Sequence, residues 1–214
     1  MSVQVADIES VKRRLRFDYL GARSDPTSRV LDGYVSILAH LQRQPMSLRD
    51  MMQDTANWIH RQFRLRWCMI GLRGADGVYK YEVEAGMRPE AWAKQKVKLY
   101  KNSDFDPSAQ NYKAGEISKL SRVYLEEENQ LPKEDEGVVN RPALLKGRRK
   151  SDDETLEADF IDTLILGPGN ELLGWIEYSG TLTGKFPDPM TIRFIEGISA
   201  ILASAITSQS AAKA

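Results

Sequence analysis

The stretch FIDTLILGPGNELLGWIEYSG, residues 160–180, decides the fold predicted from this sequence. It contains two apolar runs that are rich in strand formers, residues 160–166 and 172–179. The Gly-Pro-Gly-Asn segment between them has the composition of a turn, so the whole stretch predicts a β-hairpin.

Two carboxylates lie within this hairpin. Asp162 interrupts the first run, and alternation along the second run would turn Glu177 and Trp175 to the same face. A buried Asp162 would need an arginine or a polar ligand as its partner, whereas an edge position would leave it in solvent. The sequence leaves both interpretations open.

A second hairpin is predicted upstream, in FRLRWCMIGLRGADG at 63–77 and the residues that follow. The run 67–72 is apolar, and an Ala-Asp-Gly turn separates it from a second candidate strand at 78–85. The three glycines of this stretch lead into a strand rather than a helix, and no Gly-Lys-Ser/Thr follows them. They therefore indicate a hairpin turn rather than a phosphate-binding loop.

Cys68, the only cysteine of the chain, lies within the apolar run of this second hairpin. Burial among apolar neighbours raises the pKa of a thiol and makes it inert, so Cys68 is predicted to be a core residue. The two histidines, His40 and His60, fall on predicted helices, and no Cys/His/Asp cluster has metal-ligand spacing. The sequence assigns no metal site and no cofactor.

Apolar residues at spacings of three and four predict helices before, between and after the hairpins. Residues 1–22 predict a helix or a loose arm, and residues 87–98 a short helix. After a turn at 24–27 comes a stripe made of Val30, Leu31, Tyr34, Ile37, Leu38 and Leu41. Ser47 begins the next helix with a weak capping box, and its buried face is predicted to be Leu48, Met51, Met52, Thr55, Ile59 and Phe63. Asp188-Pro189 begins the last helix, with a stripe of Ile192, Ile195, Ile198, Leu202 and Ile206.

Residues 99–157 carry clusters of charge, at 126–128, 133–136 and 148–154. We interpret this segment as a solvated, partly mobile insertion in preference to a charged recognition surface. Aromatic residues lie in or beside the predicted sheet and this segment. Such residues either line a small-molecule pocket or fill a core.

The composition excludes some classes of partner. The chain has 214 residues, with 30 Lys plus Arg and 30 Asp plus Glu, so no net charge attracts nucleic acid or an anionic membrane. A single cysteine cannot form an internal disulfide, which fits a reducing compartment. The N-terminus lacks the apolar core of a signal peptide, and no segment is predicted to span a bilayer. These observations predict a cytoplasmic protein that binds neither nucleic acid nor a membrane.

In order and spacing, the pattern resembles a GAF domain from about residue 47 to residue 206. The resemblance rests on SLRDMMQDTANWIHRQF leading into RWCMIGLRGADGVY, on the 160–180 hairpin, and on the closing helix PMTIRFIEGISAILASAI. It implies an α+β fold, with an antiparallel sheet of five or six strands, terminal helices on one face and a variable helix and loop segment over a pocket on the other. The layout is then an N-terminal helical extension at 1–46, a GAF-like domain at 47–208 with a charged variable insertion at 99–157, and a disordered tail at 209–214.

The resemblance also implies small-molecule sensing in intracellular signal transduction, and a homodimer formed through the terminal helices. The candidate ligand-binding residues are Trp67, Tyr81, Trp92, Tyr100, Tyr112, Asp162 and Trp175. The Asn-Lys-Phe-Asp-Glu motif of cyclic-nucleotide-binding members is absent, and Cys68 has no adjacent histidine for a bilin. One cysteine cannot support the cycle of the free methionine sulfoxide reductases of this fold. The ligand therefore stays unassigned.

Three functions are compatible with these features. The first is a non-catalytic regulatory domain that senses a small molecule between the sheet and residues 87–157 and signals to a protein partner. The alternative is a dimerisation or protein-interaction scaffold without a ligand. The third is an enzyme, which needs a nucleophile with its base, or paired carboxylates in a cleft. No spacing suggests one, but a perturbed Asp162–Glu177 pair would favour it.

Overall fold

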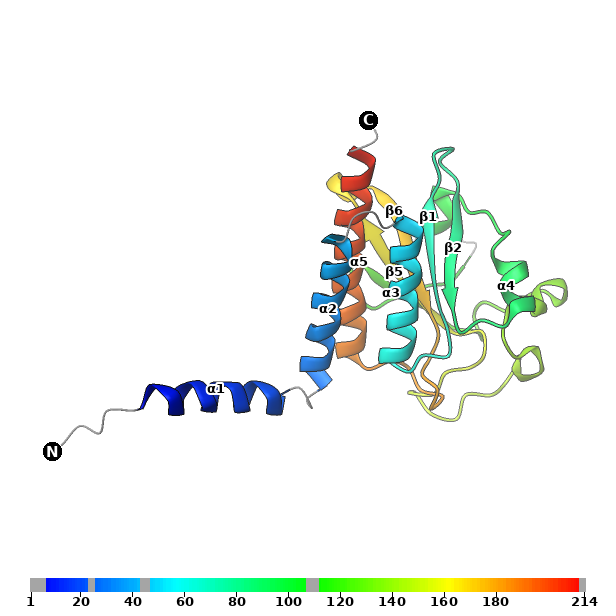
Figure 1. The fold of residues 1–214 in the computed structure, drawn as a ribbon. Coiled ribbons are helices and arrows are strands. Elements are labelled where there is room, and N and C mark those ends of the chain that lie inside the picture. Colours follow the sequence, from blue (N-terminus) through cyan, green and yellow to red (C-terminus); the bar gives the residue numbers. More distant parts are fainter. Residues whose placement is uncertain (1–6, 23–25, 43–46, 107–111, 212–214) are drawn as a thin grey trace.

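The computed structural model describes residues 7–22, 26–42, 47–106 and 112–211. Its centre is a six-stranded sheet in the order β2-β1-β6-β5-β4-β3 (Figure 1). The strands are β1 Cys68–Arg73, β2 Tyr79–Ala85, β3 Gly115–Glu116, β4 Ser121–Tyr124, β5 Phe160–Leu166 and β6 Leu172–Tyr178. All neighbouring strands are antiparallel. This confirms the predicted α+β fold with an antiparallel sheet, and of the five or six strands expected the structure has six.

The helices are α1 Ile8–Ala22, α2 Pro26–Gln42, α3 Leu48–Gln62, α4 Pro89–Gln95 and α5 Pro189–Ala211. Four of them, α2 to α5, cover the two faces of the sheet (Figure 1). The helices α2, α3 and α5 lie on one face, whereas α4 and the loops around it lie on the other (Figure 1). The 3₁₀ turns η1 (Asn102–Phe105) and η2 (Lys133–Val138) belong to the segment that includes α4. The layers predicted from the sequence are therefore present.

The β5–β6 hairpin forms as predicted. Ile161 pairs with Tyr178 at one end and Leu166 with Leu172 at the other. Between the strands, Gly169 and Asn170 have φ angles of 69° and 63°, a left-handed conformation that glycine and asparagine adopt most readily. The turn residues thus set the register of the two strands at the centre of the fold.

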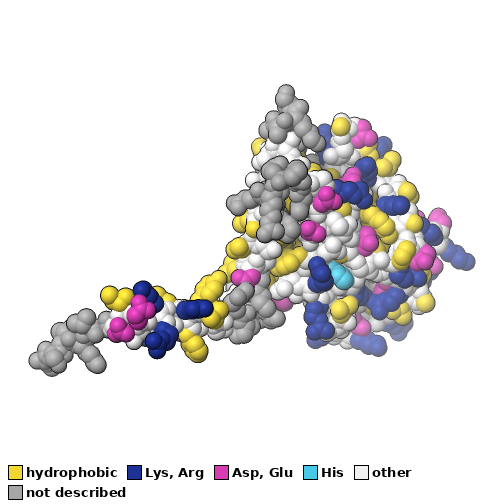
Figure 2. Space-filling model, in the orientation of Figure 1, with side chains coloured by type: hydrophobic (Ala, Val, Ile, Leu, Met, Phe, Trp, Pro, Cys, Tyr) yellow, Lys and Arg dark blue, Asp and Glu magenta, His cyan; other side chains and the backbone are white. Residues whose placement is uncertain are grey.

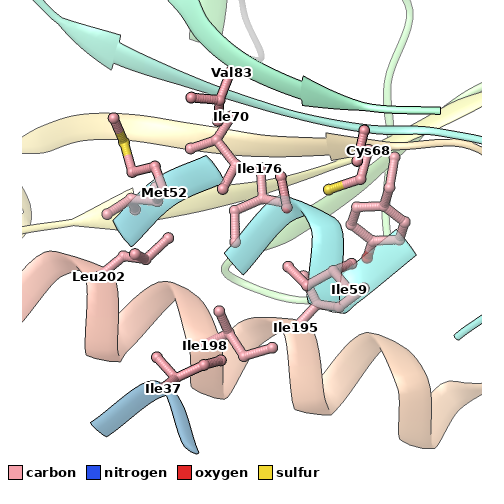
Figure 3. Close-up of a cluster of buried hydrophobic side chains, with 14 of the residues drawn as sticks. Ile37, Met52, Ile59, Cys68, Ile70, Val83, Ile176, Ile195, Ile198 and Leu202 are labelled. Carbon is pink, nitrogen blue, oxygen red and sulfur yellow. The ribbon is translucent and has the colours of Figure 1, made fainter. Parts of the chain in front are cut away.

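The alternation of side chains along β6 separates two apolar clusters. Ile176 and Tyr178 are buried against the helices α3 and α5, whereas Trp175 belongs to an aromatic cluster on the opposite face. Figure 3 shows the helix-side cluster, in which Cys68 lies beside Ile59. Cys68 is fully buried, so the prediction of a core cysteine is confirmed, and burial raises the pKa of its thiol.

The helices α3 and α5 both begin at the predicted caps. The Ser47 hydroxyl accepts a hydrogen bond of 3.1 Å from the backbone N–H of Asp50. At the start of α5, the Asp188 carboxylate accepts one of 2.9 Å from the N–H of Thr191. Each bond satisfies a backbone donor that a helix N-terminus leaves without an intrahelical partner.

The α2 stripe is half buried, because Leu31 and Leu38 are 52% and 45% exposed. Two predictions need correction. The segment 99–157 contains β3 and β4, two strands of the sheet that the sequence did not predict. Finally, residues 189–209 of α5 are long and apolar enough to cross a bilayer by length and composition, contrary to the prediction. Their apolar character has a structural explanation, since one side of α5 is part of the buried cluster. The side chain of Leu41 is outside the part of the chain that the structure describes, and so is the predicted helix stop at Pro45.

Helix α1 projects away from the body of the molecule (Figure 1). Figure 2 shows hydrophobic side chains on its surface. The exposed apolar residues of this helix are Ile8, Val11, Leu15, Phe17, Tyr19 and Leu20.

Candidate ligand-binding site

A cavity of about 110 Å³ lies between the sheet and the segment that contains α4, η1 and η2. Of the seven residues predicted to bind a ligand, six line it: Trp67, Tyr81, Tyr100, Tyr112, Asp162 and Trp175. The seventh, Trp92, does not line the cavity. Its ring packs against that of Tyr81 from α4, with 6.5 Å between the ring centroids. Trp92 therefore contacts the lining residue Tyr81 without lining the cavity itself.

Trp175 is the centre of the aromatic lining. Its ring centroid lies 4.9 Å from those of Tyr81 and Phe105 and 5.5 Å from that of Tyr100. Room for the indole comes from Gly71, the residue paired with Trp175 on β1, because a Cβ at that position would overlap the ring. The rings come from β2, η1, β6 and the residues after α4, so the tertiary fold brings them together.

Two carboxyl groups lie side by side in this aromatic lining. Asp162 on β5 is paired with Glu177 on β6, and both side chains line the cavity. Each residue is only 6% exposed. The hydroxyl of Tyr81 on β2 donates a hydrogen bond of 2.5 Å to Oε2 of Glu177. The sheet thus carries a buried acidic pair at the base of the cavity.

The pair titrates far from its ordinary range. Burial raises the pKa of Asp162, and the neighbouring Glu177 raises it further. Burial also raises the pKa of Glu177, to about 7, while the hydrogen bond from Tyr81 acts in the opposite direction. Because the two carboxyl groups are neighbours across β5 and β6, each affects the pKa of the other, and they titrate as a pair.

One oxygen of the pair is unsatisfied. Within the described part of the chain, Oδ1 of Asp162 is buried without a hydrogen-bond partner. Arg122 is paired with Asp162 across β4 and β5, but its guanidinium donates to the carbonyl of Phe105 at 2.5 Å. A buried polar atom without a partner costs about 1–3 kcal/mol. Oδ1 of Asp162 can therefore accept a hydrogen bond from a bound ligand.

Other lining residues were not predicted to be site residues. Phe105, Lys98 and Tyr124 come from the 99–157 segment or its border, where the sequence pattern gives no strand or long helix from which to place a side chain. Glu177 was recognisable, since alternation turns it to the face of Trp175, and the structure confirms that shared face. Tyr112 lies at the rim, with 49% of its surface exposed.

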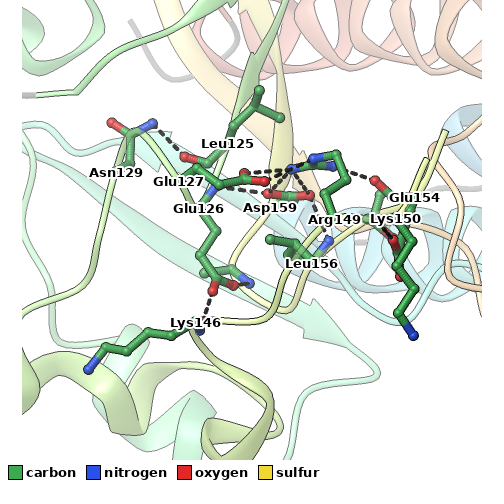
Figure 4. A network of polar contacts seen from close by, with 12 residues as sticks. Leu125, Glu126, Glu127, Asn129, Lys146, Arg149, Lys150, Glu154, Leu156 and Asp159 are labelled. Atoms are coloured by element: carbon green, nitrogen blue, oxygen red, sulfur yellow. Dashed lines mark hydrogen bonds and ion pairs between the residues drawn. The ribbon is translucent and has the colours of Figure 1, made fainter. Parts of the chain in front are cut away.

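The segment over the cavity is held by buried acids rather than by apolar packing alone. Asp159, fully buried, accepts hydrogen bonds from the backbone N–H groups of Glu126 and Leu156 and forms an ion pair of 3.0 Å with Arg149 (Figure 4). Glu126 in turn accepts from the N–H groups of Lys146 and Ala158. These carboxylates fix loops that are distant in sequence.

A third acid ties the same segment to Arg66, which precedes β1. Glu157 accepts two hydrogen bonds from the Arg141 side chain, at 2.7 and 2.9 Å, and lies 3.4 Å from Arg66. Glu126 and Glu157 are each 4% exposed, so the prediction that the charges of 99–157 are solvated is wrong for these two residues. Their partners are backbone N–H groups and arginines that the fold supplies.

Within the described residues, no group of three or more His, Cys, Asp or Glu side chains has the arrangement of a metal site. The cavity is lined mainly by aromatic rings, tyrosine hydroxyls and the acidic pair, and further polar side chains come from Gln95, Lys98, Asp104, Asn129 and Glu157. This arrangement suits the binding of a small molecule by ring contacts and hydrogen bonds.

No protein-family model and no curated protein matches the chain by sequence. Solved structures match it closely in fold. The GAF domain of A. aeolicus nlh2 in an inactive state superposes with a TM-score of 0.56 at 12% identity, covering 86% of this chain and 99% of that one. The GAF domain of a phosphoenolpyruvate-protein phosphotransferase from Coxiella burnetii gives 0.54 at 16% identity, covering 86% and 96%.

A third similar structure is the phycoerythrobilin-bound GAF domain of a cyanobacterial phytochrome. It has a TM-score of 0.54 at 13% identity and covers 87% of this chain and 97% of its own. At these identities the likeness shows the fold, and the resemblance to GAF domains found in the sequence is confirmed at that level.

Proposed function

We propose, from the GAF fold of this chain and the cavity on its sheet, that the protein is a regulatory domain that senses a small molecule. The observation that carries the proposal is the buried, aromatic cavity in which Oδ1 of Asp162 has no partner among the described residues. A core built only for stability would not retain an unsatisfied carboxyl oxygen at the edge of a cavity. The bilin held by the phytochrome GAF domain supports the idea that this fold can enclose a ligand.

Two strands that line the cavity, β4 and β6, also contact the helices on the other face of the sheet. Trp175 and Glu177 alternate along β6 with Ile176 and Tyr178, which pack on the helix side. On β4, Tyr124 lines the cavity while Ser121 donates a hydrogen bond of 2.8 Å to Glu196 of α5. A ligand that displaces Trp175 or Tyr124 therefore acts on strands that contact α5 directly.

Binding fits the acidic pair better than catalysis does, although the pair meets one condition for an enzyme. Glu177 accepts a hydrogen bond of 2.5 Å from the Tyr81 hydroxyl. This donor holds the carboxyl group as an acceptor rather than leaving it free to remove a proton from a substrate. We therefore assign the pair to ligand recognition, in a cytoplasmic protein whose single thiol is reduced.

The experiment that tests this function is native mass spectrometry of the full chain, followed by the same sample denatured. A mass excess that is lost on denaturation reports a retained small molecule. Ala158 lines the cavity, so Ala158→Phe should fill it and abolish the excess. Ala143→Phe, on the exposed side of the same segment, should retain it. An excess that is equal in both variants would place the molecule elsewhere and contradict the proposal.

A second function is favoured by a separate observation. The six exposed apolar residues of α1 are joined by Leu31, Val35 and Leu38 of α2, which are also exposed. Apolar surface of this kind marks protein–protein contacts when it is contiguous. The alternative is therefore a homodimer formed through α1 and α2, with or without a ligand in the cavity.

A further inference from the structure

The acidic pair at the base of the cavity has no cationic side chain as a direct partner. Among the described residues, neither Asp162 nor Glu177 forms an ion pair within 4.0 Å. Glu177 accepts one hydrogen bond, from the Tyr81 hydroxyl, and Oδ1 of Asp162 has no partner. A negative charge on this pair lies among aromatic rings, an arrangement that is costly without a cation beside it.

The cations closest to the pair are engaged elsewhere. Arg122 faces Asp162 from β4, but it donates to the carbonyl of Phe105. Lys98, which lines the cavity from the residues after α4, lies 3.8 Å from Asp135. Both lower the pKa of the pair from a distance without forming a hydrogen bond to it that would satisfy Oδ1 of Asp162.

The rings around the pair offer a second attraction for positive charge. Tyr81, Tyr100 and Phe105 surround Trp175 at ring-centroid distances of 4.9 to 5.5 Å. The faces of such rings carry partial negative charge and attract organic cations, tryptophan most strongly. The carboxylates and the rings therefore favour the same sign of ligand charge.

From this arrangement we infer that the cavity binds a small organic monocation with N–H donors, a primary ammonium or an amidinium, whose charged end contacts Asp162 and Glu177. The inference rests on the proposed sensing function and names the ligand class of that site. The size follows from the cavity volume of about 110 Å³. A cavity of about 150 Å³ holds benzene, so the cation has about six non-hydrogen atoms or fewer.

Binding of such a cation is linked to the proton that the pair holds. A cation is attracted to the ionised pair, so its affinity should rise with pH as Glu177 loses its proton near pH 7. The groups that face the pair are Arg122 on β4, Lys98 after α4, and the hydroxyls of Tyr81 and Tyr100. Burial raises the pKa of both tyrosines, so Glu177 is the member of the site expected to change its protonation near pH 7.

The test is isothermal titration calorimetry of the full chain with three probes of equal length: n-butylamine hydrochloride, 1-butanol and sodium butyrate. The ammonium should bind at least about tenfold more tightly than the alcohol, and butyrate should not bind. Its affinity should be higher at about pH 8 than at about pH 6, where more of Glu177 is protonated. The alcohol should show no such change.

Two variants and a control separate charge from packing. Glu177→Gln removes the charge with little change of shape and should weaken butylammonium binding at least about tenfold while abolishing its pH dependence. Asp162→Asn should also weaken it. Glu90→Gln, an exposed carboxylate on α4, should leave affinity unchanged. Thermal unfolding of each variant checks that it is folded.

The outcomes distinguish the ligand class from the sensing function. Tighter binding of butanol or butyrate, lost in Ala158→Phe, would overturn the cation and leave the sensing function standing. Butylammonium binding that is unaffected by Glu177→Gln would also overturn the inference. If no probe binds the wild type and native mass spectrometry shows no retained molecule, both the inference and the sensing function fail.

Discussion

Glu177 holds a proton more tightly in the folded protein than in the unfolded chain, because burial raises its pKa from the ordinary 4.5 to about 7. Between these two values the folded state binds more protons than the unfolded state. The free energy of unfolding therefore falls as the pH rises through this window, and the contribution is constant above pH 7. Asp162, whose pKa is also raised by burial, acts in the same direction.

Glu177→Gln should reduce this loss of stability. The amide oxygen can still accept from Tyr81, and the amide nitrogen can donate to Asp162, but no charge is buried. Between about pH 5 and about pH 8 the free energy of unfolding of the variant should fall by at least about 1 kcal/mol less than that of the wild type. Urea unfolding at the two pH values measures it, with Glu90→Gln as the control. Parallel behaviour of wild type and Glu177→Gln would show that the group is not perturbed as described.

For single residues, the sequence predicted side-chain positions that follow from strand alternation or from apolar neighbours. The shared face of Trp175 and Glu177 follows from the period of a strand, and the burial of Cys68 follows from its apolar neighbours. The burial of Glu126 and Asp159 was not predictable. Their partners are an arginine and backbone N–H groups, and one of these N–H groups lies 33 residues away in the sequence. No local pattern encodes such bonds.

Helix α2 packs on the domain through the buried side chains of Val30 and Ile37, and one aromatic side chain adds a hydrogen bond. The Tyr34 hydroxyl donates a hydrogen bond of 2.6 Å to the carbonyl of Phe194 on α5, and the two rings pack edge to face. Gly197 makes this approach possible, since a Cβ there would lie 2.5 Å from the tyrosine oxygen. Burial raises the pKa of Tyr34 to about 12, so the hydroxyl stays a donor.

Tyr34→Phe should lower the free energy of unfolding by about 1 kcal/mol, because the carbonyl of Phe194 loses its donor while the ring contact remains. Tyr19→Phe is the matched control, since Tyr19 on α1 is 66% exposed. Chemical denaturation of the three proteins gives the comparison. A loss of equal size in both variants would mean that the bond does not hold α2.

Among the elements, those with strong local signals were predictable and those defined by pairing were not. The two hairpins and the helices α3 and α5 have turn residues, caps and apolar periodicity of their own. The strands β3 and β4 have two and four residues, too few for a period to be recognised. The partner of β4 is β5, about forty residues later, so this strand exists only because the tertiary fold offers it an edge.

For the whole molecule, the apolar surface of α1 predicts self-association. Leu15 is 66% exposed on this helix, and a charge there would be buried at any interface that α1 forms. Sedimentation velocity should show a dimer for the wild type and a monomer for Leu15→Glu.

The control is Leu182→Glu, because Leu182 is a leucine of comparable exposure, 61%, outside the terminal helices. This variant should remain dimeric. A wild type that is monomeric over a wide range of protein concentrations would contradict the dimer, and it would leave the cavity as the basis for function.

The outer edge of the sheet has a further consequence. β2 is an edge strand of seven residues, long enough to recruit a strand from another molecule. Its first residue, Tyr79, is already paired with Tyr100 through two backbone bonds of 2.9 Å. Near its end, the carbonyl of Glu84 accepts from Gln53 at 2.6 Å, and the Lys80–Glu82 ion pair places charge between them. Backbone pairing at one end, the Gln53 side chain at the other and the charges between them thereby guard this edge against amyloid-like strand addition.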